Sequence, residues 1–334
     1  AVLWASSRKD LLAALFSICS MIAYVTYLQE GDPKKRWWSI GFFAIALLAK
    51  VSVFPLPLAF ILLDRLENRS GLKMQLLDKI PYAIVAVPLI LAGAFGGSQF
   101  LAPLGIMNFL ILAAKSTAFT LSQLAWPSRL SLLHYQPEPI AFDFGVVMSV
   151  AVTIMLGLIT LWSLCWKSSK GRLTSFGLWL FCLMLAPTFA AAQKGGLLFF
   201  ASDKYAYLPA VGIMVLVALG IEYAFMKKKP VANAALVVSI AIACGFAFLT
   251  TKQAQSWKND DVLLASILTK DPTNPIALAN KGLLLLEDKK PDEALVFFDA
   301  AIASDPHYAI SHINAASAYR AKGDAEAVLT MYER

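Results

Sequence analysis

Long apolar runs alternate with short polar segments along most of the chain. Five runs reach or nearly reach the roughly 20 residues that a helix needs to cross a bilayer. They cover residues 11–27, 144–166, 176–192, 207–225 and 231–250, and a shorter run covers residues 81–96. Because these runs carry almost no charge, they predict membrane-spanning helices rather than the core helices of a soluble protein.

Two further apolar stretches are ambiguous. Residues 37–63 are too long for one helix and contain Lys50 and two prolines, and residues 108–126 contain a lysine and several polar residues. The loops rich in Lys and Arg are residues 30–36, 64–79, 167–172 and 226–230. If all four are cytoplasmic, as the positive-inside rule indicates, residues 37–63 form two short helices that turn near Lys50. Residues 108–126 then lie along the outer surface.

The alternative topology treats both stretches as single spans. It places Lys50 in hydrocarbon, which costs at least ~2.5–3.5 kcal/mol, and it moves the basic 64–79 loop outside. We therefore favour the hairpin. Both topologies give about eight crossings. Both place the N-terminal edge, the octet "SDKYAYLP" (202–209) and everything after Thr250 on the non-cytoplasmic side.

The composition changes after Thr250. Two segments of the tail match each other with a period of 34 residues, so that Pro272 corresponds to Pro306 and Asn280 to Asn314. Small, aromatic and proline residues typical of a tetratricopeptide repeat (TPR) stand at Gly282, Ala294, Phe298, Ala301 and Pro306. We predict an all-α protein with a membrane helix bundle at 1–252 and a TPR α-solenoid at 253–334. Two repeats do not decide between a spacer and a groove for protein partners.

Composition and charge exclude several classes of function. The chain is 58% hydrophobic and 15% charged, whereas soluble domains contain about 25% charged residues. The net charge of +7 comes largely from the short loops, which is a topology signal, so we expect no nucleic-acid partner. Common motifs of soluble enzymes are absent from the sequence, and its three histidines lack metal-ligand spacing. We therefore predict no metal site and no firm cofactor.

The polar residues at the predicted outer membrane edge can bind a lipid-linked sugar phosphate, because an anionic headgroup needs fixed cations. The candidate phosphate-binding residues are Lys50, Lys204, Arg8 and Lys9. The candidates for positioning a sugar or an acceptor are Asp203, Tyr205, Asp10, Glu138 and His134. Several of these also fit an ordinary role as a snorkelling lysine, a flanking charge or a belt aromatic residue. Lys50 fits such a role least, since it interrupts an apolar run.

Several segments resemble, in the same order, those of one family of membrane enzymes. They are "AVLWASSRKDLLAALFSICSMIAYVTYL" (1–28), "LLAKVSVFPLPLAFILLDR" (47–65), "TLSQLAWPSRLSLLHYQPEP" (120–139), "MLAPTFAAAQKGGLLFFASDKYAYLPAVGI" (184–213) and the tail from Trp257. This order is similar to that of the transmembrane O-mannosyltransferase and TPR family and its bacterial relatives. These proteins belong to the GT-C class of glycosyltransferases, which use lipid-phosphate sugars.

The resemblance implies transfer of a sugar, mannose-like, from a polyprenyl-phosphate donor to an acceptor protein or glycan on the non-cytoplasmic face. It also implies that the catalytic carboxylate lies upstream of Ala1, in an acidic outer loop, and that residues 1–334 alone are inactive. Lys204 stands where the family pattern has arginine. A lysine keeps the charge but lacks the bidentate fork of arginine for phosphate.

Two other functions stay open. The chain can be a non-catalytic membrane anchor that displays a TPR scaffold for envelope assembly. It can also be a polymerase or ligase of lipid-linked oligosaccharides, although the order of the spans and the TPRs argues against that. The short loops favour a bacterial inner membrane, with periplasmic TPRs, over an endoplasmic reticulum.

Overall fold

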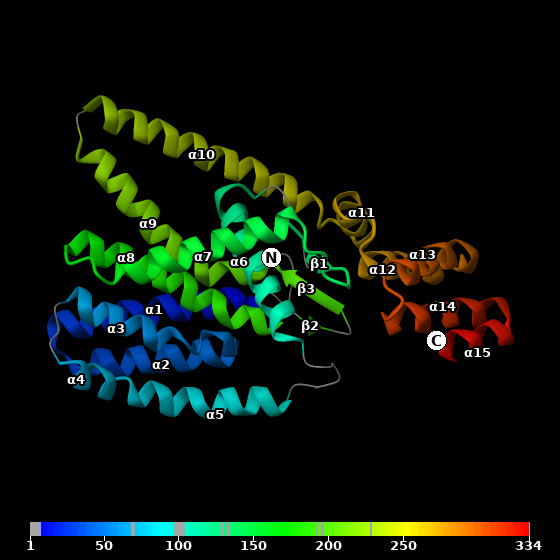
Figure 1. Ribbon diagram of the computed structural model, residues 1–334, viewed down its shortest axis with the longest axis horizontal. Helices are drawn as coiled ribbons and strands as arrows, with labels where there is room; N and C mark the ends of the chain where they lie inside the picture. Colours follow the sequence, from blue (N-terminus) through cyan, green and yellow to red (C-terminus); the bar gives the residue numbers. More distant parts are fainter. Residues whose placement is uncertain are drawn as a thin grey trace.

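The computed structural model describes residues 8–67, 71–96, 104–127, 130–131, 134–191, 193–194, 197–227 and 229–333. Within these residues the chain is all-α apart from one small sheet. A bundle of long helices forms one side of the molecule, and shorter helix pairs extend from one of its ends (Figure 1). The predicted all-α class, with membrane-type helices, is confirmed.

The N-terminal part of the bundle contains the hairpin that the sequence predicts. Its elements are α1 (Arg8–Glu30), α2 (Pro33–Ala49), the 3₁₀ turn η2 (Val51–Val53) and α3 (Leu56–Leu66). The helix α2 ends because Lys50 adopts an extended backbone, with φ −157° and ψ 116°. The prolines that follow suit the start of α3, where a missing N–H does no harm. The division of the long apolar stretch into two helices that meet near Lys50 is confirmed.

The other helices of the bundle are α4 (Leu72–Leu77), α5 (Ile80–Gly96), α6 (Ile106–Ala125), α7 (Phe144–Ser163), α8 (Ser169–Leu185), α9 (Tyr207–Phe225) and α10 (Lys229–Gln255). Among the described helices, five are long and apolar enough to cross a membrane: α1, α7, α9, α10 and α8 together with its 3₁₀ extension. The chain is therefore a multi-pass membrane protein. The position of α6 along the outer surface and the number of crossings stay predictions.

Aromatic rings and a glycine pair hold the centre of the bundle. Tyr24 stacks on Phe60 with ring centroids 4.5 Å apart, and Tyr82 meets Phe60 edge-on at 5.2 Å. The helices α8 and α9 cross at Gly177 and Gly212, where a Cβ on either glycine would overlap the carbonyl of the other. This close crossing fixes the position of α9 near its first turns.

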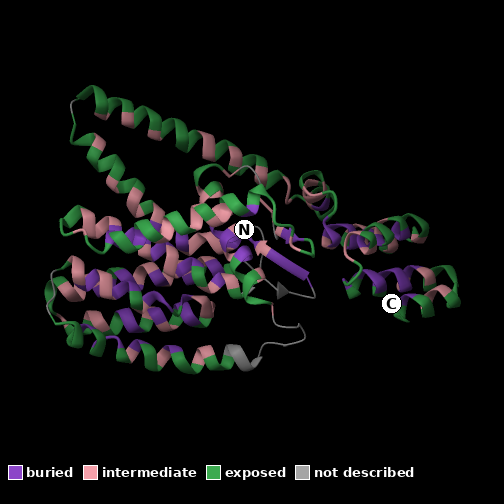
Figure 2. Ribbon diagram, viewed as in Figure 1, coloured by how far each residue is buried: buried purple, intermediate pink, exposed green. Residues whose placement is uncertain are grey.

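The surface of the bundle suits a lipid environment. In α10 every described residue is exposed or half-buried, although the helix is strongly apolar (Figure 2). The helices α9 and α10 diverge from their connecting loop, so that α10 lies apart from the rest of the bundle (Figure 1). An apolar helix without protein partners along most of its length is expected to face hydrocarbon.

The segment 64–79, interpreted from the sequence as a basic cytoplasmic loop, also supplies a buried polar cluster. Asp64 and Lys79 form an ion pair in which the aspartate is fully buried and the lysine is 8% exposed. The hydroxyl of Tyr24 donates to Asp64 Oδ1 at 2.7 Å, and Lys79 Nζ lies 4.5 Å from the centroid of the Tyr24 ring. This cluster ties α1 to α3 and to the start of α5.

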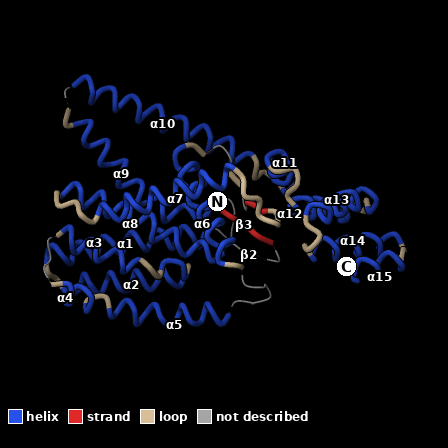
Figure 3. The backbone as a smooth tube through the Cα atoms, in the orientation of Figure 1, coloured by secondary structure: helices blue, strands red, loops and turns tan. Residues whose placement is uncertain are grey.

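A three-stranded antiparallel sheet, which the sequence did not lead us to expect, lies where the bundle meets the tail (Figure 3). Its strands are β1 (His134–Gln136), β2 (Gln193–Lys194) and β3 (Leu197–Ala201), in the order β1-β3-β2. The pairing sets His134 opposite Ala201. The sheet therefore brings the loop after α6 next to the segment that leads into α9.

The tail consists of short helices: α11 (Asp260–Lys270), α12 (Pro275–Glu287), α13 (Pro291–Ser304), α14 (Ala309–Lys322) and α15 (Ala325–Glu333). Gly282 on α12 faces the ring of Phe298 on α13, where any side chain would overlap the ring, so the two helices pack closely. The start of the tail also packs on the sheet: Tyr135 and Phe199 share an apolar cluster with Leu278 and Tyr308. The bundle and the tail are therefore in direct contact.

Candidate functional site at the junction of bundle and tail

The octet 202–209 forms the turn between the sheet and the bundle. After β3 the chain makes the 3₁₀ turn η4 (Asp203–Ala206) and continues directly into α9. The N–H of Tyr205 donates to the carbonyl of Ser202 at 2.9 Å, which closes the turn. Lys204 is only 7% exposed. A buried lysine next to a carboxylate at the edge of a membrane domain makes this turn a candidate functional site.

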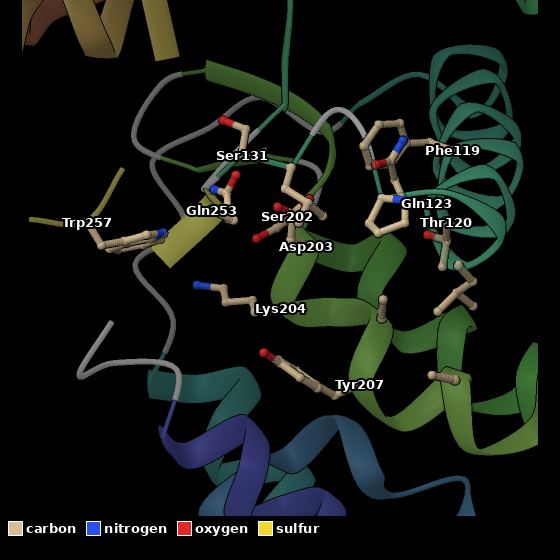
Figure 4. Close-up of a pocket in the computed structure, with 15 residues that line it drawn as sticks. Phe119, Thr120, Gln123, Ser131, Ser202, Asp203, Lys204, Tyr207, Gln253 and Trp257 are labelled. Atoms are coloured by element: carbon tan, nitrogen blue, oxygen red, sulfur yellow. The ribbon is translucent and has the colours of Figure 1, made fainter. Parts of the chain in front are cut away.

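A cavity of about 350 Å³ opens beside this turn. Its polar and aromatic lining residues include Asp203, Lys204, Tyr207, Gln123, Gln253, Trp257 and Phe119. They come from η4, α9, α6 and the end of α10 with the loop after it. Figure 4 shows that Lys204 and Tyr207 point their polar ends toward the side where Trp257 lies. Among the described lining residues, Asp203 is the one carboxylate and Lys204 the one cation.

His134 positions the carboxylate. Its Nε2 lies 3.1 Å from Asp203 Oδ1. The imidazole packs against Phe119 at 4.2 Å between centroids and against Phe200 at 5.6 Å. The pairing of β1 with β3 carries His134 to this place, and the aromatic rings restrict its orientation. Two predicted positioning residues, His134 and Asp203, are therefore brought together.

A second, much smaller cavity of about 20 Å³ lies behind the turn. Lys50 and Asp10 form an ion pair at its wall, and Lys50 Nζ lies 4.6 Å from the centroid of the Tyr205 ring. Among the described residues, Asp10 Oδ2 is buried with no hydrogen-bond partner. The volume suffices for about one water molecule. Lys204 and Tyr207 line both cavities and form the wall between them.

The remaining predicted residues lie elsewhere. Arg8 and Lys9 are exposed at the start of α1, and Glu138 is exposed in the loop after β1. These three residues line neither of the two cavities. Lys50 is near the site, but its ammonium is engaged by Asp10 rather than directed into the larger cavity. Lys204 is thus the predicted phosphate ligand that faces the larger cavity.

Several residues at the site were missed in the sequence. Gln253 and Trp257 lie beyond the end of the last apolar run, and they reach the cavity because α10 continues to Gln255. Lys270 at the end of α11 donates to the carbonyl of Leu130 at 2.7 Å. Burial lowers the pKa of Lys270, and the nearby charge of Asp203 opposes that shift. No local sequence signal marks these residues, since their position near the turn depends on contacts between segments that are far apart in the chain.

Comparison with known proteins gives one partial likeness. The chain is 26% identical over 116 residues to "Protein O-mannosyl-transferase Tmtc2" of Drosophila melanogaster. The matched part is 35% of this chain and 12% of that protein, so the chain spans a small share of its relative's length. No protein-family model matches the chain, and no solved structure matches it.

Proposed function

We propose that this chain takes part in glycosyl transfer: it binds a polyprenyl-phosphate sugar and transfers the sugar to a hydroxyl of an acceptor. The observation that carries the proposal is the larger cavity at the end of the membrane bundle, which is lined by one buried lysine, Lys204, and one carboxylate, Asp203. The partial likeness to a protein O-mannosyltransferase supports the same reaction class. The topology favours the non-cytoplasmic face, and GT-C-type chemistry with a mannose-like sugar follows from the family resemblance.

The reaction needs a base and a partner for the leaving group. The acceptor oxygen attacks the anomeric carbon of the sugar, and the bond from that carbon to the phosphate oxygen breaks. The hydroxyl proton passes to the carboxylate of Asp203, and the polyprenyl phosphate leaves with the electron pair of the broken bond. The ammonium of Lys204 stabilises the charge that develops on the departing phosphate. This step gives Asp203 the role of base, which the family resemblance instead assigns to a carboxylate upstream of Ala1.

The other lining residues suit a sugar. Trp257 and Tyr207 provide flat aromatic faces, and the amides of Gln123 and Gln253 provide donors and acceptors for sugar hydroxyls. His134 holds Asp203 in place through its hydrogen bond. The pair of Lys50 and Asp10 supports the turn from behind through the ring of Tyr205.

A non-catalytic membrane scaffold explains the tail but not this cavity. A scaffold gives no reason for a lysine that is 7% exposed and a carboxylate to line the same cavity. Charged side chains that line a cavity at the edge of a membrane bundle are candidates for ligand binding. The scaffold interpretation therefore predicts that Asp203 and Lys204 tolerate substitution.

The test is transfer of radiolabelled sugar from a polyprenyl-phosphate donor by the full-length protein in detergent. We expect Asp203→Asn and Lys204→Met each to lower the rate at least about 100-fold. Glu138→Gln and Lys9→Met are matched controls, because both residues are exposed and line neither cavity. Equal transfer by all four variants would contradict the assigned site. The absence of transfer with a panel of donor lipids would favour the scaffold.

A further inference from the structure

A third cavity, of about 480 Å³, lies between α11 and α12 of the tail. We call it the tail groove; it is lined by Ser131, Asp260, Leu263, Leu264, Ile267, Asn274, Ile276, Ala277, Asn280, Leu283, Leu284 and Glu287. Ser131 also lines the larger cavity of the candidate site. The tail groove and the larger cavity of the candidate site therefore share Ser131 in their walls, although most of their lining residues come from different parts of the chain.

The lining of the tail groove is apolar at its base and acidic at its edge. Among its described lining residues the charged ones are Asp260 and Glu287, both exposed, and no cation is present. Asn274 is buried and its Oδ1 caps α12 by accepting from the N–H of Ala277 at 3.1 Å. Asn280 is exposed, so its amide is accessible to a ligand in the groove. An exposed amide beside apolar side chains and carboxylates suits an extended, cationic polypeptide.

The position of the groove relative to the site is fixed by direct contacts. Lys270 on α11 donates to the carbonyl of Leu130, next to the shared Ser131. Tyr135 of β1 donates to Asp305 Oδ2 at 3.0 Å, and an apolar cluster joins the sheet to α12. The groove therefore lies beside the cavity that Asp203 lines, with Ser131 in the wall of both.

From these observations we propose that the tail groove is an acceptor subsite, which binds an extended polypeptide segment that carries a basic residue several positions from the hydroxyl that receives the sugar. The proposal rests on the proposed function, and it deepens that function by placing the binding site of the acceptor and naming its charge preference. The basic residue pairs with Glu287 and Asp260, apolar side chains contact the leucines, and the hydroxyl reaches Asp203 past Ser131. The chemical step is the one given above, with the polypeptide hydroxyl as nucleophile.

The experiment separates docking from transfer. The full-length protein in detergent is titrated with two fluorescent threonine peptides, long enough to span the tail groove and the cavity that Asp203 lines. One peptide has lysines, and the other glutamates, in the part that occupies the groove. We expect Glu287→Lys to weaken binding of the lysine peptide about 10-fold and Glu287→Gln about 3-fold. Glu293→Lys is the matched control, since Glu293 is exposed on α13 and does not line the groove. Transfer is measured with the same peptides and with a blocked single threonine, which is too short to occupy the groove.

The proposal is supported if Glu287→Lys weakens both the binding of the lysine peptide and the transfer of sugar to it. Transfer to the blocked threonine must stay within about 2-fold of the rate of the unchanged protein. Equal binding by Glu287→Lys and Glu293→Lys would overturn the subsite, and so would a preference for the glutamate peptide. A change in oligomeric state with unchanged peptide binding would also overturn it and assign the groove to a second copy of the chain. Selective binding with no transfer to any acceptor would contradict the proposed function but leave the polypeptide groove in place.

Discussion

Two buried lysine–aspartate pairs lie toward opposite ends of α1, and they differ in a way that separates structure from function. Near one end Lys50 pairs with Asp10, and near the other Lys79 pairs with Asp64. In both pairs the ammonium also lies over a tyrosine ring, at 4.6 and 4.5 Å from the centroid. The pairs are thus alike in residue types and in burial of the aspartate.

Their hydrogen bonding is different. Both oxygens of Asp64 accept a bond, one from Tyr24 and one from Lys79. Among the described residues, Asp10 Oδ2 has no hydrogen-bond partner, and the pair borders the small cavity behind the turn 202–207. A fully satisfied pair stabilises the fold, whereas an incompletely satisfied pair beside a cavity is suited to respond to what binds there.

The largest expected effect follows loss of the satisfied pair. Lys79→Met removes the ammonium that pairs with the fully buried carboxylate of Asp64, which should destabilise the protein by about 3–5 kcal/mol. The change in stability is measured by thermal unfolding of the detergent-solubilised protein, with size-exclusion chromatography used to monitor the folded fraction. Lys73→Met serves as the control, because Lys73 is exposed on α4. Equal stability of the two variants would show that the Asp64 pair does not stabilise the fold.

Removal of both charges should restore most of that stability. In the double variant Asp64→Asn/Lys79→Met, the asparagine can still accept from the hydroxyl of Tyr24, and both charges of the ion pair are removed together. We expect a stability within about 2 kcal/mol of the unchanged protein, so the two substitutions are far from additive. The same unfolding assay tests this. A double variant as unstable as Lys79→Met alone would contradict a purely electrostatic cause.

The Lys50 pair should respond more weakly in stability and more strongly in transfer. Lys50→Met is expected to cost about 1–3 kcal/mol, since water in the small cavity can hydrate Asp10. It should also lower the transfer rate about 10-fold, because the support of Tyr205 behind the turn is lost. Unfolding and transfer are measured on the same preparation. A stability loss as large as that of Lys79→Met, with transfer unchanged, would remove the distinction between the two pairs.

Part of this arrangement could be predicted from the sequence. Lys50 within an apolar stretch, followed by two prolines, was sufficient to predict the hairpin, because charge and proline both disfavour a continuous span. The sequence also marks residues 202–209 as a boundary, because this polar octet separates two apolar runs. These are local signals, and each depends on residues close together in the chain.

The rest depends on contacts between distant segments. In the charge pattern Lys79 is one more basic residue of a loop. A count of charges does not show that Asp64 and Tyr24 surround its ammonium. The strands β1 and β3 are three and five residues long, too short for a reliable period-2 pattern. Trp257 lines the cavity because it follows α10 and because the tail packs against the sheet. Burial and pairing of this kind have no signature in one sequence.

The smallest expected change in stability concerns His134. Two variants at this position distinguish a positioning role from a purely structural one. His134→Gln can still donate to Asp203 Oδ1, whereas His134→Ala cannot, and both lose the imidazole that packs against Phe119 and Phe200. We expect the two variants to unfold within about 1 kcal/mol of each other, with transfer about 10-fold slower for alanine and near the unchanged rate for glutamine. A purely structural role would give equal transfer by the two variants. Equal loss of transfer would show that packing of the ring, rather than its hydrogen bond to the carboxylate, maintains the site.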